Sequence, residues 1–232
     1  MEDMPVMEIW ISGTIAQVKA AAASGLAAAV ATNPTIIADW TRGGRTLESV
    51  VSEAADGLNV PLYVQLHGPD LDGYLVEFEA LRRISDLIQP KLVATEAGIT
   101  AAGMLARAGF KPLVTAVCSA SQAVLAAAAG ASFVAPYLGR ITDAGADGIG
   151  LVRDIAQLLS SHGSATRIVT ASVRSPQQAE AALLAGAHAV VVFDDVFKQM
   201  FASALTQASI DGFERDWEQI ALHAQSAQQP TF

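Results

Sequence analysis

A repeat of helical stretch, glycine and apolar run constrains the fold of this chain more than any other feature. Gly57 precedes "PLYVQLH" and Gly186 precedes "AVVVF", and four further glycines precede similar runs. Glycine suits the left-handed position that ends a helix, and short continuous apolar runs are typical of parallel strands buried on both faces. With the runs "EIWIS" and "KLVATE" added to these six, we predict eight strands, at about residues 8–12, 28–32, 62–67, 91–95, 112–117, 133–137, 167–172 and 189–193.

Eight alternations of strand and helix favour a (β/α)8 TIM barrel over an open doubly wound sheet. No G-x-G-x-x-G motif follows the first strand, which argues against dinucleotide binding. An extra C-terminal helix, "DGFERDWEQIALHA" at about 211–224, has no strand to follow it. Its apolar side chains, Phe213, Trp217, Ile220 and Leu222, indicate packing on the barrel or on a neighbouring subunit. We therefore predict a single barrel domain over residues 1–232.

The composition limits the class of partner. Apolar residues make up 52% of the chain and charged residues 16%, so a large core is expected and disorder is excluded. The net charge of −9, without a basic cluster, argues against nucleic acid and anionic membranes as partners. The acidic start "MEDMPVMEIW" does not resemble a signal peptide, and the uncharged stretch 112–139 fits a strand, a helix and a strand. We expect a cytoplasmic protein.

Polar residues gather where the predicted strands end, and in such barrels chemistry lies at the carboxyl ends of the strands. In chain order these residues are Ser12, Thr32, Asn33, Gln65, His67, Lys91, Thr95, Glu96, Thr115, Tyr137, Arg140, Ser172, Arg174, Asp194 and Asp195. Most have a structural interpretation as well, as satisfied core groups, rim residues or first-turn carboxylates. Arg140 and Arg174, near a serine at a late strand end, together resemble a phosphate site.

Lys91 allows two interpretations. As the first residue of strand four, it could extend its ammonium group to solvent at the bottom of the barrel, as Lys111 could at the start of strand five. A lysine inside an apolar barrel would instead have a lowered pKa and become a nucleophilic amine, which forms a Schiff base with a carbonyl substrate. Alternation places Lys91, Val93 and Thr95 on one side of the strand, and periodicity alone does not settle which side faces inward.

Four motifs resemble those of the transaldolase family, above all of the small fructose-6-phosphate aldolases and short transaldolases. They are "ATNPTII", "KLVATEAG", "FVAPYLGRI" and "TASVRSPQQA", and the similarity extends over nearly the whole chain. The resemblance implies a (β/α)8 barrel with a class I mechanism, without a metal or another cofactor. It also implies a homo-oligomer, a pentamer or decamer, whose last helix reaches a neighbouring subunit.

The resemblance also implies roles for individual residues. Lys91 occupies the place of the Schiff-base lysine, and the catalytic water and proton transfers would fall to Gln65, Thr115 and Tyr137. Tyr137 favours an aldolase, because transaldolases proper usually have phenylalanine there. Substrate hydroxyls would contact the "TN" pair of the second strand end, and a phosphate would bind at the late strand ends. These positions are Thr32, Asn33, Arg140, Ser172 and Arg174, and with Ser12 and Asp194 at the ends of the first and eighth strands they form the predicted set of substrate-binding residues.

The chain departs from the family pattern at three places. The first strand of the family ends in D-T-[SA] with an active-site aspartate, whereas this chain has Ser12. The lysine motif has lost its proline, and "VFDD" replaces "LPLD" at strand eight. Strands eight and one are neighbours in a closed barrel, so we hypothesise that Asp194 partly replaces the lost carboxylate. In the alternative, the donor differs and no carboxylate is needed.

We therefore predict a class I aldolase or transaldolase that acts on a ketose or ketose phosphate, with a donor other than fructose 6-phosphate. Its partners would be a small sugar or sugar phosphate and an aldehyde. The alternative is a catalytically impaired barrel kept for binding or assembly. The lost aspartate favours that alternative, whereas the retained Lys91, Gln65, Thr115, Tyr137 and Ser172 oppose it.

Overall fold

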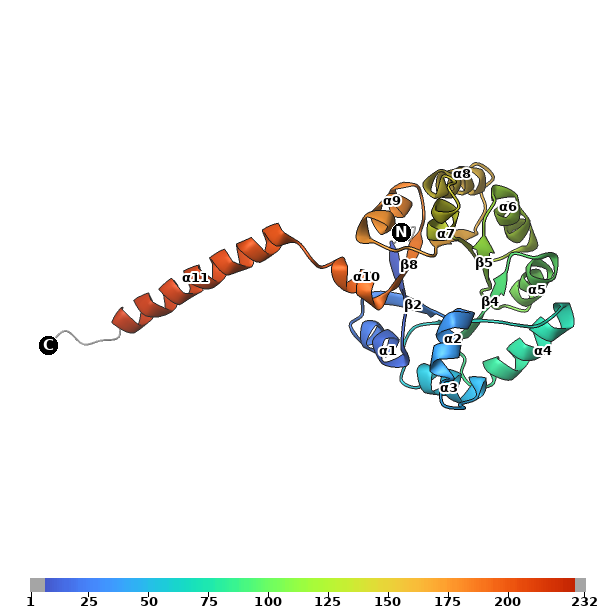
Figure 1. The fold of residues 1–232 in the computed structure, drawn as a ribbon, viewed down its shortest axis with the longest axis horizontal. Coiled ribbons are helices and arrows are strands. Elements are labelled where there is room, and N and C mark those ends of the chain that lie inside the picture. The colour runs from blue at the N-terminus through green and yellow to red at the C-terminus, as the bar shows by residue number, and fades with distance from the viewer. Residues whose placement is uncertain (1–6, 228–232) are drawn as a thin grey trace. The chain divides into compact units, whose positions relative to one another are not determined.

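Eight parallel strands close into a barrel in the computed structural model, which describes residues 7–227 (Figure 1). The strands are β1 (Glu8–Ser12), β2 (Ala27–Ala31), β3 (Leu62–Gln65), β4 (Ile88–Val93), β5 (Leu113–Val117), β6 (Phe133–Pro136), β7 (Arg167–Thr170) and β8 (Ala189–Phe193). Each strand pairs with its neighbours in chain order, and β8 pairs with β1. The predicted (β/α)8 barrel is confirmed. Residues 1–6 and 228–232 lie outside the described part of the chain. The first of these ranges includes the start of "MEDMPVMEIW", the segment that the sequence analysis compared with signal peptides.

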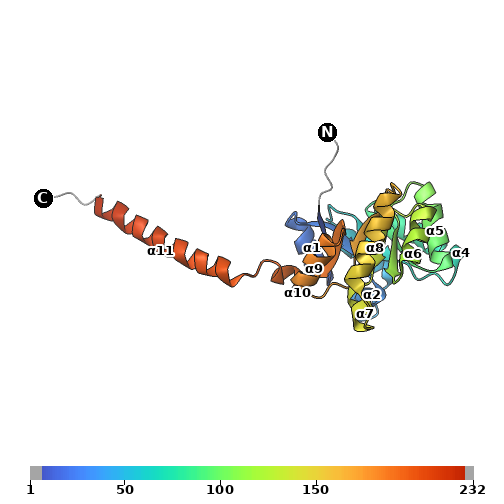
Figure 2. The ribbon, with the colours of Figure 1, turned by 90° about the horizontal axis from the view of Figure 1, so that it is seen from above.

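Helices surround the strands in the view along the barrel, and Figure 2 shows several of them running beside it. They are α1 (Ile15–Ala23), α2 (Pro34–Trp40), α3 (Leu47–Ala55), α4 (Leu71–Arg82), α5 (Glu96–Arg107), α6 (Ala120–Ala129), α7 (Leu138–Asp143), α8 (Gly148–Ser161), α9 (Pro176–Leu184) and α10 (Asp194–Gln199). The glycines that the sequence places after helices have positive φ, as at Gly130 with φ 95°. The uncharged stretch 112–139 forms β5, α6 and β6, as predicted.

Strand four begins earlier than predicted. The prediction started it at Lys91, the first residue of the run "KLVATE". In the structure Ile88, Gln89 and Pro90 pair with residues 62–64 of β3, and Lys91 pairs with Gln65. Lys91 therefore lies inside β4 rather than at its head. Thr95, predicted as the last strand residue, caps α5 instead by accepting a hydrogen bond from the Gly98 N–H group.

Large side chains fill the amino-terminal part of the barrel. The ring centroids of Trp10 and Tyr63 lie 4.6 Å apart, and Phe133 meets Trp10 edge-on at 5.0 Å. Small buried alanines, among them Ala31 and Ala135, accompany this cluster inside the barrel. The second and larger part of the core lies between the strands and the helices. Aromatic and small apolar side chains thus fill the amino-terminal part of the barrel interior.

Two compact units make up the chain, with the division between Phe197 and Lys198. The second unit contains α11 (Ala204–Ala227), which begins seven residues before the predicted helix at 211. Ser203 accounts for the earlier start, since its hydroxyl accepts a hydrogen bond from the Thr206 N–H group in the way of an N-cap. The prediction of one domain whose last helix packs on a neighbouring subunit stays a prediction.

No helix within residues 7–227 is both long and apolar enough to cross a membrane.

Candidate active site

A cavity of about 240 Å³ opens at the carboxyl ends of the strands. It is lined by Ser12, Asn33, Thr35, Lys91, Tyr137, Arg140, Ala171, Ser172, Arg174, Val191 and Phe193. The lining comes from β1, β4 and β8 and from the segments that follow β2, β6 and β7, which meet only when the barrel closes. The structure therefore brings together seven of the site residues that the sequence predicts, together with Thr35, Ala171, Val191 and Phe193, which it does not.

Lys91 is a buried amine at this cavity. Its side chain is 5% exposed, and its Nζ donates a hydrogen bond of 2.6 Å to the Thr32 carbonyl oxygen at the end of β2. Burial lowers the pKa of Lys91 from 10.5 to about 7, because a charged ammonium is poorly solvated in an apolar interior. The interpretation of Lys91 as a solvated residue at the bottom of the barrel is therefore wrong. A lysine with this pKa is partly neutral at physiological pH, and the neutral amine is the form that can act as a nucleophile.

Thr32 and Gln65 hold the side of the site next to the amine. The Thr32 hydroxyl donates to the Tyr63 carbonyl oxygen at 3.2 Å and accepts from the Gln65 N–H group at 3.0 Å. Thr32 therefore faces the amine with its carbonyl group rather than its hydroxyl. The Gln65 Oε1 is buried and has no hydrogen-bond partner among the described residues. A buried acceptor of this kind is costly unless a water or a ligand group bonds to it.

Tyr137 and Thr115 form a hydroxyl pair across β5 and β6. The Thr115 hydroxyl donates to the Tyr137 hydroxyl oxygen at 3.3 Å, and Thr115 is fully buried. The guanidinium of Arg140 lies 5.6 Å from the centroid of the Tyr137 ring. Tyr137 lines the same cavity as the amine and could exchange a proton there, whereas Thr115 lies behind it and does not line the cavity.

The cationic side is built by Arg140, Ser172 and Arg174. Ser172 has a φ of 61°, a strained conformation for a non-glycine residue, and its carbonyl oxygen accepts the Gly139 N–H group at 3.0 Å. A Cβ at Gly139 would lie 2.3 Å from that oxygen, so only glycine permits this contact. Arg174 forms a two-pronged ion pair with Asp143, with one bond of 2.6 Å. Two guanidinium groups beside a serine hydroxyl suit an anionic group of a substrate.

The side of the cavity formed by β8 and β1 is largely apolar. Val191 and Phe193 line it, and Phe193 pairs in register with Ser12. The Ser12 hydroxyl is buried and donates a hydrogen bond of 2.6 Å to the Ala31 carbonyl oxygen. Phe193 ends β8 and so lies at a strand end, as the polar candidates do. The sequence analysis missed it because it considered only polar side chains at these ends.

Asp194 does not line the cavity. It begins α10, and its Oδ2 accepts a hydrogen bond of 3.0 Å from the Gln17 side chain, which also closes the capping box of α1. The structure thus gives no support for the hypothesis that Asp194 replaces the lost first-strand carboxylate. Asn33 does line the cavity; its Oδ1 caps α2 by accepting the Ile36 N–H group, and its side-chain NH2 group can donate to a substrate.

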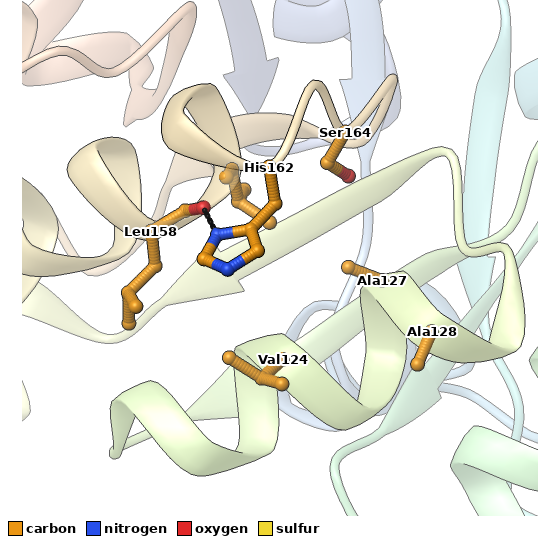
Figure 3. A pocket seen from close by; sticks show the side chains of 7 residues that line it. Val124, Ala127, Ala128, Leu158, His162 and Ser164 are labelled. Atoms are coloured by element: carbon orange, nitrogen blue, oxygen red, sulfur yellow. Dashed lines mark hydrogen bonds between the residues drawn. The ribbon is translucent and has the colours of Figure 1, made fainter.

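A second hollow, of about 480 Å³, lies outside the barrel between α6 and α8 (Figure 3). Val124 and Leu158 contribute apolar walls, and the His162 Nδ1 lies 2.9 Å from the Leu158 carbonyl oxygen. Neither a lysine nor an arginine lines this hollow. The barrel mouth, which combines a buried amine, a phenol and two guanidinium groups, is therefore the candidate active site.

The fold and this site define a (β/α)8 barrel with a buried lysine at its mouth. The family model described as transaldolase/fructose-6-phosphate aldolase matches residues 11–229. A "probable transaldolase" of Pelotomaculum thermopropionicum is 38% identical over 92% of this chain and 99% of its own length. Another, of Brevibacillus brevis, is 39% identical over 83% of this chain and 89% of its own length. The chain therefore belongs to the transaldolase/fructose-6-phosphate aldolase family, whose members are aldolases and transaldolases.

A thiamine phosphate pyrophosphorylase from Pyrococcus furiosus has a similar structure, with a TM-score of 0.52 over 81% of this chain and 85% of that chain. The sequence identity is 17%, so this likeness concerns the fold alone.

Proposed function

We propose that this chain is a class I aldolase or transaldolase, which makes or breaks a carbon–carbon bond of a ketose or ketose phosphate through a Schiff base on Lys91. The observation that carries the proposal is the buried amine, whose pKa is about 7. Neutral Nζ attacks the ketone carbon, and loss of water leaves an iminium ion that withdraws electrons from the neighbouring carbons. No metal is needed in this mechanism, because the iminium ion is the electron sink.

The cleavage step transfers one proton and breaks one bond. A base removes the proton from the C4 hydroxyl, the C3–C4 bond breaks, and the electron pair forms an enamine while the aldehyde leaves. Tyr137 is placed for this proton transfer, helped by Thr115 and by a water held at the Gln65 Oε1. The enamine is then protonated at C3 and hydrolysed, as in an aldolase, or added to a second aldehyde, as in a transaldolase.

Binding of the substrate would be divided over the cavity. Arg140, Ser172 and Arg174 would hold an anionic tail, and Asn33 would donate to a substrate hydroxyl. Thr32 would act through its carbonyl group, which positions the amine. Ser12 replaces the carboxylate of related aldolases, and this supports a donor other than fructose 6-phosphate. Sugar phosphates as substrates would place the reaction in the cytoplasm.

Borohydride trapping tests the proposal. The protein is incubated with dihydroxyacetone, hydroxyacetone or a ketose phosphate, reduced, digested and analysed by mass spectrometry. We expect the mass of the reduced adduct on Lys91 and none in the Lys91→Met variant. Lys111→Met is the matched control, because Lys111 is exposed on the barrel and lies outside the cavity. Absence of an adduct with every ketone would reject the enzyme and favour a barrel kept for binding or assembly.

We also propose a homo-oligomer, a pentamer or decamer, in which α11 contacts a neighbouring subunit. Within α11, Phe213, Trp217 and Ile220 are exposed and recur at the spacing of one helix face. Light scattering after size-exclusion chromatography measures the mass. A Phe213→Asp and Trp217→Asp double variant should lower the number of subunits, and a monomeric wild-type protein would reject this part of the proposal.

A further inference from the structure

We infer that Asp143 is a positioning residue of the anion site, which holds the Arg174 guanidinium so that its free side binds the phosphate group of a substrate. This inference rests on the proposed Schiff-base function, in which Arg140, Ser172 and Arg174 hold an anionic tail. It adds to that site a residue that does not line the cavity.

The ion pair of Asp143 and Arg174 joins the two segments that build the anion site. Asp143 is the last residue of α7, one turn after Arg140, and Arg174 lies between β7 and α9, two residues after Ser172. Both side chains of the pair are about half exposed. Exposed ion pairs contribute little to stability, because solvent screens them and two flexible side chains lose freedom. The main consequence of this pair is therefore the orientation of Arg174.

The contacts of the guanidinium show which of its N–H groups remain available. A guanidinium has five N–H groups, which form one fork from the two Nη atoms and another from Nε with the nearer Nη. Nη1 and Nη2 of Arg174 donate to the two carboxylate oxygens of Asp143, the first at 2.6 Å. Asp143 thus occupies the outer fork. The Nε–H group has no acceptor within residues 7–227, so the second fork is open to a ligand.

The open fork lies beside the serine of the anion site. A Cβ placed on Gly139 would be 3.0 Å from the Arg174 Nε and 2.9 Å from the Ser172 Oγ, so these two atoms flank the same glycine. Arg174 and Ser172 both line the cavity, and their donors can therefore reach one anion together. Without Asp143 the half-exposed Arg174 side chain would change between rotamers, and binding of an anion would have to order it again.

Asp143 also has an opposite effect on a bound anion, because its carboxylate repels a phosphate group. The carboxylate lies across the guanidinium from the open fork and is half exposed. Solvent and salt therefore screen the repulsion to about a twofold change in affinity. The ordering of a long side chain during binding weakens affinity by about tenfold. Because the ordering effect is larger, removal of Asp143 should weaken the binding of phosphorylated substrates.

Kinetics with two acceptor aldehydes test the inference, with dihydroxyacetone as the donor. Glyceraldehyde 3-phosphate carries the anionic group, and glyceraldehyde lacks it. We expect Asp143→Ala to raise KM for glyceraldehyde 3-phosphate about tenfold, while kcat and the KM for glyceraldehyde change less than about twofold. Asp143→Asn keeps one acceptor oxygen for the guanidinium, so its KM should lie between the other two. Glu79→Ala is the matched control, because Glu79 forms exposed ion pairs with Arg82 and Arg83 outside the cavity.

A second measurement does not depend on activity. Inorganic phosphate should raise the melting temperature of the wild-type protein, because a ligand that binds the folded state stabilises it. The apparent dissociation constant from this titration should be about tenfold higher for Asp143→Ala and unchanged for Glu79→Ala.

The possible outcomes have separate meanings. A KM for glyceraldehyde 3-phosphate that is unchanged or lower in Asp143→Ala overturns the inference, and a lower value would show that the carboxylate competes with the substrate. Equal losses with both acceptors would assign Asp143 a purely structural role and also overturn it. Absence of trapped adducts with every ketone overturns the proposed function, and the phosphate titration then decides alone. Equal dissociation constants for the wild-type protein and Asp143→Ala, or no effect of phosphate on either protein, overturn the inference as well.

Discussion

The buried amine of Lys91 should make the stability of the barrel depend on pH. The unfolded chain keeps this proton up to about pH 10.5, whereas the folded chain loses it near pH 7. The unfolded state therefore binds more protons between these values, so the free energy of unfolding rises with pH across this window. At about 1.4 kcal/mol for each pKa unit, the buried amine costs the fold up to about 5 kcal/mol at low pH. From pH 7 to pH 9 the recovery amounts to about 2 kcal/mol.

Replacement of Lys91 by methionine removes this contribution and keeps a side chain of similar length. We expect Lys91→Met to be more stable than the wild-type protein at pH 6, with the advantage shrinking by about 2 kcal/mol between pH 7 and pH 9. Guanidinium unfolding followed by circular dichroism at pH 6, 7, 8 and 9 measures this difference. Lys111→Met, at an exposed site, should follow the wild-type curve.

Two results would refute this reasoning. The first is a constant stability difference between Lys91→Met and the wild-type protein across the pH range, because a solvated amine contributes no such slope. The second would come from borohydride trapping. The yield of trapped adduct should rise with pH through a midpoint near 7, because the neutral amine becomes populated there. A midpoint above pH 9 would show that the amine is not desolvated in the free enzyme.

Three further predictions concern other residues. His188 has its pKa lowered by burial below the usual 6.5, so its contribution to stability should fall as pH drops through 6.5; thermal melts of His188→Asn should show less acid destabilisation between pH 7 and pH 5. Gly139→Ala should lower the melting temperature and raise KM for a phosphorylated substrate about tenfold, because the added Cβ clashes with the Ser172 carbonyl; Gly212→Ala, with only an ordinary contact, is the control. Tyr137→Phe should lower kcat about a hundredfold while trapping of the amine persists, and loss of trapping would assign the phenol a different role.

Local chemistry made the strands and helices predictable. Glycines such as Gly130 end helices because their positive φ is costly for other residues, and the apolar runs after them are long enough only for short strands. The start of β4 could not be predicted from the sequence, because proline is unfavourable within a central strand and Pro90 therefore suggests that no strand continues through it. Pairing with Val64 of β3 holds Pro90 within the strand. The conformational preference of a single residue can thus be outweighed by pairing with the neighbouring strand in a closed barrel.

For the candidate site too, the sequence predicted the kinds of residue present, and the tertiary structure determined their contacts. The sequence identified the chemical groups, among them Lys91, Tyr137 and Arg140, because polar residues stand out where apolar strands end and because the motifs around them resemble those of the family. It missed Asp143, whose ion pair with Arg174 joins residues 31 positions apart. It placed Asp194 beside the first strand, as the pairing of Ser12 with Phe193 shows, but it could not tell that Asp194 bonds to Gln17 and does not line the cavity.

The sequence by itself determined the repeat of strand and helix, the family and the residue types that can carry the chemistry. Only the tertiary structure decided that Lys91 points into the barrel, and that the Ser12 hydroxyl is bonded to a carbonyl group beside an apolar wall. The physical reason is closure. The direction of a strand's side chains and the solvation of an amine depend on which strands lie beside it, and those neighbours are set by the whole ring rather than by the local sequence.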